Sequence, residues 1–233
     1  MSSRRVAMAV TLAAVFAAPC WGMPSVTVTE TFDGTIDQAT WRMGTQDEIL
    51  PAGGNPGAYL RVPGVDTAEP RISTVPSLAP QFLGNYRERG VIGLGIDINL
   101  FDVGVSADGR PVSLFLHSNM ETPDDLLDDC EVVLVGSKNV PRPGAGWRRY
   151  DFKVPAWSRT LPQNWVVNGV CSGLSPDEAW NRVITNVTDA SFDLGELGFF
   201  YHFQIWDTGF DNPRITLGKG GTGPTFVVIE PLD

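Results

Sequence analysis

Histidine and cysteine, the residue types that most often bind zinc, are scarce in this chain. Its 233 residues include two histidines, His117 and His202, and three cysteines. Because neither histidine has a second one at ligand spacing, a catalytic zinc site is not expected. The chain also lacks a glycine-rich loop that joins a strand to a helix, and it lacks the Gly-x-Ser-x-Gly elbow of serine hydrolases. A serine–histidine–aspartate triad stays open, since its members meet in space and not in sequence.

Basic residues are also few. Lysines and arginines number 17 against 27 aspartates and glutamates, so the formal net charge is −10 at pH 7. Binding to nucleic-acid phosphates requires clustered cations, and nucleic acid is therefore not expected as a partner. An anionic membrane surface is disfavoured for the same reason. Past residue 22 no apolar run is long enough to span a bilayer, so no membrane span is expected.

The first 22 residues have the layout of a secretory signal peptide. Arg4 and Arg5 precede the apolar run 6–18, which is too short to cross a bilayer as a helix. Small residues follow, and the predicted cut lies between Gly22 and Met23. The mature protein is therefore expected to be exported, either secreted or periplasmic.

Three alternatives to this signal remain open. Cleavage after Ala18 is also compatible with the pattern. Residues 3–5 match part of a twin-arginine signal but lack the residues that normally follow. Cys20 is a candidate lipid-attachment cysteine, although Pro19 stands where lipoprotein signals usually carry a small residue.

Two cysteines, Cys130 and Cys171, remain once residues 1–22 are removed. In an oxidising compartment they allow one intramolecular pairing, so a disulfide is predicted. In the chain-entropy model, a closed loop of about 40 residues stabilises the fold by about 3–4 kcal/mol. Two buried free thiols are the alternative.

Short strand-like runs dominate the rest of the sequence. Glycine and proline are frequent, at 25 and 18 residues, as expected for many turns. The clearest strand is 91–101, where the apolar residues at even positions from 92 to 100 share one face. The predicted strands are 26–32, 58–62, 91–101, 112–117, 131–136, 148–154, 197–206 and 213–217.

One helix is predicted, beginning after Ser175 and ending near Asn186. Ser175 is followed by a proline and, three residues on, by Glu178, which is the pattern of a capping box. Many strands with one short helix indicate an all-β fold, an antiparallel β-sandwich of the jelly-roll type over residues 23–217. A glycine-rich tail follows at 218–233, in which a last strand at Phe226–Ile229 and disorder are both open.

Several motifs resemble known families. The segment Phe82-Leu-Gly-Asn-Tyr-Arg-Glu-Arg-Gly90, which leads into Gly95-Ile-Asp-Ile98, is similar to the centre of laminin IV (laminin B) domains and related bacterial jelly rolls. The end, Trp206-Asp-Thr-Gly-Phe-Asp-Asn-Pro-Arg-Ile215, is similar to the last strand of galactose-binding and carbohydrate-binding modules. The start, Glu30-Thr-Phe-Asp-Gly34 with Trp41, is similar to their first strand. This resemblance implies a jelly-roll sandwich that binds a carbohydrate or another extracellular component. Pro213 departs from the usual Ile or Val, which disturbs strand pairing on one edge.

The resemblance also implies a structural calcium ion. In such jelly rolls the first and last strands lie side by side, which places Glu30 and Asp33 near Asp211. Three carboxylates with backbone carbonyls suit Ca²⁺, which takes six to eight oxygen ligands. The alternative is that Asp33 belongs to a turn and Asp211 caps a strand.

Six tryptophans remain after residue 22. Two of them, Trp157 and Trp165, lie within or beside the loop-like segment 155–164. Exposed aromatic rings stack on the C–H faces of sugars, so these two are the predicted ligand-binding residues. Packing into the core or over its ends is the alternative for each of the six, which are Trp41, Trp147, Trp157, Trp165, Trp180 and Trp206.

No catalytic residue is assigned. A polysaccharide-acting enzyme needs two carboxylates about 5–10 Å apart across a cleft, and Asp97, Glu131 and Glu196 are unranked candidates. The acidic run 124–129 is interpreted as a solvated loop, because its spacing does not match a helix–loop–helix calcium loop. The sequence favours an exported, non-catalytic binding protein. A polysaccharide-acting enzyme and a purely structural surface or matrix protein remain alternatives, and the ligand and oligomeric state stay open.

Overall fold

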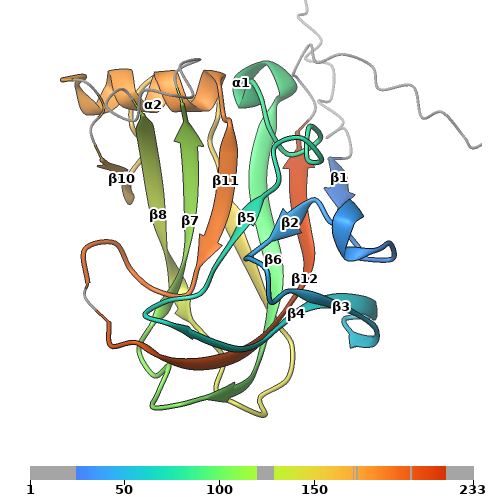
Figure 1. Cartoon of the computed structure of the whole chain (residues 1–233). Coiled ribbons are helices and arrows are strands. Elements are labelled where there is room, and N and C mark those ends of the chain that lie inside the picture. Colours follow the sequence, from blue (N-terminus) through green and yellow to red (C-terminus); the bar gives the residue numbers. More distant parts are fainter. Residues whose placement is uncertain (1–24, 120–128, 170, 172, 200, 219–233) are drawn as a thin grey trace, which may run out of the picture.

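The computed structural model is a sandwich of two antiparallel sheets (Figure 1). It describes residues 25–119, 129–169, 171, 173–199 and 201–218. In chain order the elements are β1 (Val26–Thr29), the short 3₁₀ helix η1 (Ile36–Gln38), β2 (Trp41–Arg42), β3 (Glu48–Gly54), β4 (Gly57–Thr67), β5 (Arg71–Thr74), α1 (Tyr86–Arg89), β6 (Val91–Val103), β7 (Pro111–Ser118), β8 (Cys130–Asn139), β9 (Arg148–Lys153), β10 (Trp165–Asn168), α2 (Pro176–Thr185), β11 (Asp189–Asp193) and β12 (Gln204–Leu217).

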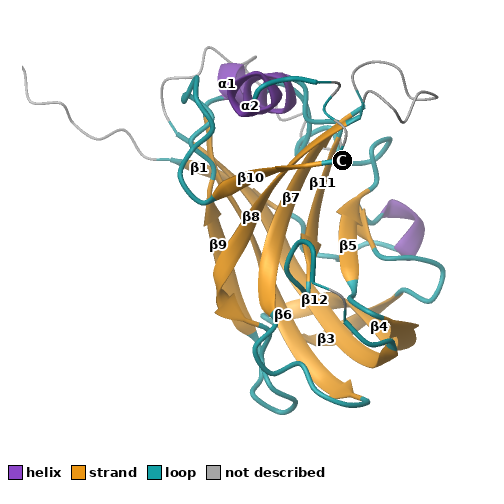
Figure 2. Ribbon diagram, turned by 90° about the vertical axis from the view of Figure 1, so that its left-hand side faces the viewer, coloured by secondary structure: helices purple, strands orange, loops and turns teal. Residues whose placement is uncertain are grey.

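Sheet A has the strand order β3-β4-β12-β6-β9, with β1 also paired to β12, and sheet B has the order β10-β8-β7-β11-β5-β2. Figure 2 looks onto sheet B, with sheet A behind it. The predicted all-β sandwich is therefore confirmed. Three predicted features fall outside the described residues: the signal segment 1–22, most of the acidic run 124–129, and the strand at Phe226–Ile229.

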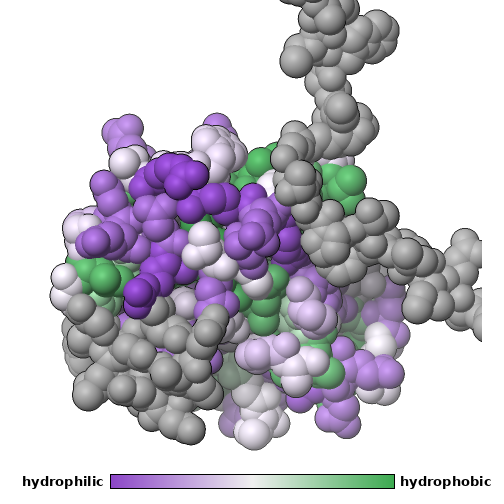
Figure 3. Space-filling view, turned by 90° about the horizontal axis from the view of Figure 1, so that it is seen from above, coloured by the Kyte–Doolittle hydropathy of each residue, from purple (hydrophilic) through white to green (hydrophobic). Residues whose placement is uncertain are grey.

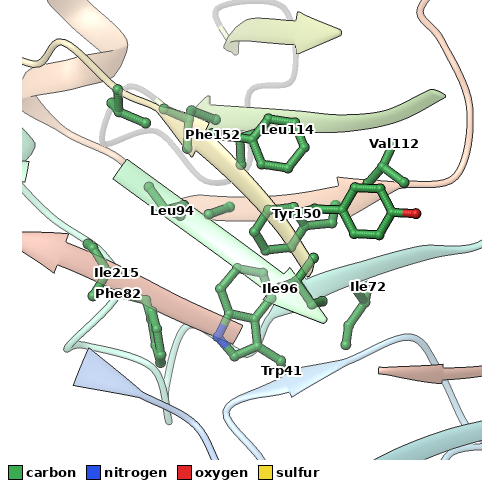
Figure 4. Close-up of a cluster of buried hydrophobic side chains, with 14 of the residues drawn as sticks. Trp41, Ile72, Phe82, Leu94, Ile96, Val112, Leu114, Tyr150, Phe152 and Ile215 are labelled. Carbon is green, nitrogen blue, oxygen red and sulfur yellow. The ribbon is translucent and has the colours of Figure 1, made fainter. Parts of the chain in front are cut away.

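The strands form where apolar and polar residues alternate, and the apolar side of each sheet faces the other sheet. In β6, Leu94, Ile96 and Ile98 lie between the sheets and are almost completely buried. Trp41 stacks on Phe192 with ring centroids 5.3 Å apart. Figure 4 shows side chains of both sheets meeting around Trp41. Because this core occupies the inner faces, functional side chains must be sought on the outer faces and in the loops.

The predicted helix is present as α2, which covers one end of the sandwich together with α1 (Figures 1 and 3). Ser175 Oγ accepts a hydrogen bond from Glu178 N, and the Glu178 carboxylate accepts one from Ser175 N, so the capping box is confirmed. The helix residues that face the sandwich, among them Trp180, Val183 and Ile184, are fully buried. Figure 3 looks down on this end, where hydrophilic residues predominate. The four-residue α1 was not predicted.

The last strand differs from the prediction. The strand predicted at 197–206 is wrong over 197–199 and 201–203, whereas 204–206 and the predicted strand 213–217 belong to one 14-residue strand, β12, which begins at Gln204. Residues 194–199 and 201–203 form a loop, despite their aromatic side chains. Two glycines lie in that loop, and Gly198 adopts a positive φ of 79° that a regular strand does not allow.

Pro213 lies inside β12 at an interruption of the ladder. The pairing of β12 with β6 shifts register between Asp211 and Arg214, and Asn212 has a φ of 49°. The proline carbonyl accepts a hydrogen bond from Glu30 N at 2.9 Å, next to β1. The predicted disturbance at Pro213 is therefore a local bulge inside a central strand, and the first and last strands do lie side by side.

The remaining predicted strands are confirmed with shifted ends, and β1 stops at Thr29 rather than at residue 32. Five strands were missed: β2, β3, β5, β10 and β11. They are short or rich in residues that rank low in strand propensity, as in the Asp-Ala-Ser-Phe-Asp of β11. Their pairing with neighbours in the sheet stabilises them.

The predicted disulfide is confirmed. Cys130 and Cys171 are bonded, with Cα atoms 4.6 Å apart. The bond ties the start of β8 to the chain that follows β10, at the edge of sheet B. Disulfides persist in oxidising compartments, which is consistent with export.

Candidate functional site

The outer face of sheet B carries a row of polar side chains. In β11, Asp189, Ser191 and Asp193 share this face, while Ala190 and Phe192 between them are buried in the core. Strand geometry alone produces this separation, since successive side chains point to opposite faces.

The register of sheet B brings further polar residues to the same face. Arg71 on β5 lies opposite Asp193, and His117 on β7 lies between Asp189 and Glu131 on the two flanking strands. Asn168 on the edge strand β10 pairs with Glu131 in turn. We call these residues the sheet B site: Arg71, His117, Glu131, Asn168, Asp189 and Asp193.

Arg71 is the centre of this site. Its guanidinium carbon lies 4.2 Å from the centroid of the Phe115 ring, so the side chain lies over an apolar floor. Nε and Nη2 donate to Asp193 Oδ2 at 3.0 and 2.8 Å, and Nη1 lies 3.9 Å from Glu131 Oε2. Glu131 Oε1 accepts a hydrogen bond from Asn168 Nδ2 at 2.6 Å. One guanidinium thus holds two carboxylates from opposite sides of the site.

Both carboxylates of β11 have a pKa raised above the usual value of an aspartate. Burial raises the pKa of Asp193 to about 7, against the lowering effect of Arg71, and nearby Glu69 raises it further. Asp193 is only 2% exposed, whereas the Arg71 side chain is 42% exposed. Burial also raises the pKa of Asp189, which accepts a hydrogen bond from the Thr74 hydroxyl. Asp193 can therefore carry a proton near neutral pH, while its partner Arg71 remains reachable from solvent.

A hollow of about 580 Å³ opens at one end of the site. His117, Asn119 and Asp189 supply its polar wall, and Pro80 and Leu83 supply part of its apolar wall. This volume is within the range of about 300–1,000 Å³ that is typical of small-molecule sites. Apolar walls with a few polar groups are also the usual composition of such sites.

Two further features lie around the sheet B site. His117 Nε2 lies 3.3 Å from Asp129 Oδ2. Ser113 Oγ donates to Gly195 O at 2.6 Å, which fixes the loop 194–203 against the outer face. That loop exposes the rings of Phe199 and Phe203, at 55% and 68%. Exposed aromatic rings are groups that the apolar face of a ligand can contact.

The two tryptophans predicted to bind ligand differ in burial. Trp157 is 67% exposed, so its ring is free to contact a ligand, and its role stays a prediction. Trp165 is only 5% exposed and packs edge-on against Trp180, with centroids 5.1 Å apart. The expectation of an exposed ring at Trp165 is corrected, because strand β10 turns this side chain into the core.

The predicted calcium ligands lie near one another, but all three already accept hydrogen bonds within the chain. Asp211 is completely buried, and its oxygens accept hydrogen bonds from Asn55 N and Asn212 N. Burial raises its pKa to about 6, and the charges of Asp97 and Asp33 add to this.

Glu30 is directed to its own segment, where Oε1 accepts from Phe32 N and Oε2 accepts from Thr40 N and its hydroxyl. Asp33 is exposed and accepts from the Thr31 hydroxyl. Within the described part of the chain, no group of three or more His, Cys, Asp or Glu side chains is arranged to hold a metal. The calcium ion stays a prediction.

The outer face of sheet A carries a second polar cluster that contains Asp97. Arg214 donates to Asp97 Oδ1 at 2.9 Å and to Asp151 Oδ1 at 2.7 Å. Asn55 and Asn212 donate to the other oxygen of Asp97 at 3.1 and 3.2 Å. Asp97 and Arg214 are each 4% exposed. These groups use one another as partners, so the cluster is closed and holds the β3–β4 turn against β12.

The other two carboxylates singled out from the sequence lie on the sheet B side. Glu131 belongs to the sheet B site, and Glu196 lies in the loop that follows β11. Arg71, Asp189 and Asp193 were not predicted from the sequence. The alternation of polar and apolar residues in 189–193 was the available signal, but five residues without a β-branched side chain did not identify a strand.

Comparisons with known proteins bear on the fold. No protein-family model matches the sequence, and no curated protein matches it. Among solved structures the chain is similar to the L4b domain of human laminin alpha-2, at 12% identity over 65% of this chain and 81% of that one, with a TM-score of 0.37. It is also similar to a carbohydrate esterase from a Shiga toxin-encoding bacteriophage, at 10% identity over 82% and 100% of the two chains, with a TM-score of 0.39. A third neighbour is a carbohydrate-binding module specific for non-crystalline cellulose, at 11% identity over 79% and 90%, with a TM-score of 0.33.

The class of fold rests on the two antiparallel sheets described above. All three TM-scores are below 0.5, so these likenesses support no inference about ligand or activity. No helix within the described residues is long and apolar enough to cross a membrane.

Proposed function

We propose that this chain is an exported, non-catalytic β-sandwich protein that binds carbohydrate at the sheet B site. The observation that carries the proposal is Arg71 over the buried ring of Phe115, with Glu131 and Asn168 next to it and a hollow of about 580 Å³ beside the site. Sugars present hydroxyl groups and apolar C–H faces together, and a site for them needs fixed donors and acceptors next to apolar surface.

The donors and acceptors of this site are held in place before a ligand arrives. Asn168 fixes Glu131, and Asp193 fixes Arg71, so little side-chain freedom is lost on binding. Both Glu131 and Arg71 keep part of their surface exposed, at 18% and 42% of their side chains. Charged groups make the stronger hydrogen bonds to neutral hydroxyls.

The charge of the site favours some sugars over others. Three carboxylates, those of Glu131, Asp189 and Asp193, lie around Arg71, and Asp129 lies beside His117. The whole chain carries a formal charge of −10. Like charges across an interface are unfavourable, so neutral or amino sugars fit the site better than uronic acids or sulfated sugars.

A glycan array with the mature protein, followed by calorimetry on the best ligand, tests the proposal. Glu131→Gln is expected to weaken binding by about tenfold or more, because a hydrogen bond to a charged group contributes about 1.5–3 kcal/mol. Asp108→Asn is the matched control, since it removes one negative charge from an exposed pair in the β6–β7 loop. Equal affinity of the two variants, or no glycan bound, contradicts the site.

A polysaccharide-acting enzyme is the second candidate. Asp193, with a pKa of about 7, is suited to donate a proton, and a single guanidinium separates it from the carboxylate of Glu131. If the array ligands are cleaved by the wild type and left intact by Asp193→Asn, the enzyme interpretation replaces the binding one.

Two predictions from the sequence, export and a structural Ca²⁺, are also part of the proposal. Export by the signal segment 1–22 is tested by the N-terminal residue of the secreted protein, which is expected to be Met23. A structural Ca²⁺ near Glu30, Asp33 and Asp211 is tested by thermal unfolding with chelator. A melting temperature unchanged by chelator and by added Ca²⁺ contradicts it.

A further inference from the structure

A groove of about 610 Å³ runs along the open side of the sandwich, between an edge of each sheet. Leu134 and Val135 of β8 and Tyr150 and Phe152 of β9 form its apolar part. Val135 is 36% exposed, which is high for a valine in a long strand. The groove is separate from the sheet B site.

Both strands that border the groove have a free edge. In the described residues β9 is hydrogen-bonded to one neighbouring strand, β6, and β10 pairs with β8 only as far as Leu134. The carbonyls of Tyr150 and Phe152 face β6, so the backbone groups of the alternate residues, such as Asp151 and Lys153, face the groove. Edges of this kind accept an additional strand.

The tail of this chain has the composition of such a strand. Residues 225–230 read Thr-Phe-Val-Val-Ile-Glu, which is rich in residues that favour strands, and prolines at 224 and 231 delimit them. Alternate side chains of a strand point to one face, so two of the four apolar residues can enter the groove together.

The distances permit this placement. Gly218, the last described residue, donates to Gly90 O at the start of β6, and Lys153 of β9 pairs with Gly93 at that same end. An additional strand on the free edge of β9 lies three strand spacings, or about 15 Å, from Gly218 at the end of β12. Residues 219–224 span up to about 20 Å when extended.

The charges also match. Lys138 and Lys153 line the groove, and Lys138 Nζ donates to Arg149 O near the far end of β9. A strand that begins beside Lys153 and runs antiparallel to β9 brings Glu230 toward Lys138 and Arg149. We infer that residues 225–230 dock in this groove as an additional strand on β9 of the same molecule.

Hydrogen exchange on the full mature chain tests this inference. In the wild type, backbone amides of 225–230 and of 148–153 are expected to be protected at any protein concentration. Val227→Pro is expected to speed exchange of residues 225–230 and of the outward-facing amides in 148–153 by about tenfold or more, since proline removes a donor to β9 and disrupts a strand. Thr222→Pro, in the linker, is the control and is expected to leave both segments protected.

Charge reversal sharpens the test. Lys138→Glu is expected to speed exchange of residues 225–230, and adding Glu230→Lys is expected to restore part of the protection. Absence of protection in 225–230 of the wild type overturns the inference. Protection that appears only at high protein concentration, together with a dimer by light scattering, also overturns it in favour of a second copy.

Discussion

The outer faces of the two sheets each carry an arginine–aspartate pair, but the two pairs differ in how exposed the arginine is. On sheet A, Arg214 and Asp97 are each 4% exposed, and both side chains are hydrogen-bonded to other residues of the chain. On sheet B, Arg71 pairs with the buried Asp193 but is itself 42% exposed, beside a hollow. An arginine–aspartate pair is therefore a fold-stabilising element where both partners are enclosed, and a candidate binding element where one partner stays accessible.

The largest expected effect separates the two arginines. Arg214→Met leaves Asp97 buried without its charge partner and is expected to lower the free energy of unfolding by about 3–5 kcal/mol. Arg71→Met is expected to cost less, about 1–2 kcal/mol, because the Arg71 side chain is 42% exposed and the buried Asp193, with its raised pKa, can take up a proton once Arg71 is removed. Urea unfolding of both variants measures this. Equal losses mean that the comparison of the two faces is wrong.

The second largest loss of stability is expected when the disulfide is removed. Replacing Cys130 and Cys171 with serine is expected to lower the free energy of unfolding by about 3–4 kcal/mol, the chain-entropy value for a loop of this length. Because the bond lies in sheet B, native-state hydrogen exchange is expected to speed up in β8 and β10 first. Uniform exchange in both sheets is the contrary result.

The pH dependence of stability involves one buried carboxylate on each sheet. Asp193 and Asp211 have folded-state pKa values of about 7 and about 6, above the usual 3.8. The folded state thus binds more protons than the unfolded state, so stability falls as pH rises from about 4 to about 7, by on the order of 1 kcal/mol or more per group. Denaturant midpoints at several pH values measure it.

Two variants separate the contributions of Asp211 and Asp193 to this pH dependence of stability. Asp211→Asn is expected to remove the part of the decrease that ends near pH 6, and Asp193→Asn the part that continues toward pH 7. Stability that rises over this range contradicts both assignments.

The smallest effect on stability is expected at an exposed ion pair. Arg142→Gln breaks the ion pair with Asp108, in which the side chains are 80% and 62% exposed. Exposed pairs contribute about 0–1 kcal/mol, so the change is expected to stay within about 0.5 kcal/mol. A larger loss, measured by the same urea titration, indicates that exposure is a poor guide to the value of the other pairs.

Much of the fold was predictable from local patterns. The alternation in 91–101 identified β6, the spacing of Ser175 and Glu178 identified α2, and two cysteines left one pairing. The loop at 194–203 was not predictable from its apolar residues. Whether such a segment pairs depends on its neighbours in the sheet, which a window of sequence does not contain.

The sequence by itself determined the class of fold, the helix cap and the disulfide, because these depend on periodicity, on groups three residues apart, and on counting. The tertiary structure alone decided the candidate site. Arg71, Glu131 and Asp193 are up to 122 residues apart in the chain and meet only through the register of sheet B. It also decided that Trp165 is buried and Trp157 exposed, since burial depends on which face of a strand meets the core.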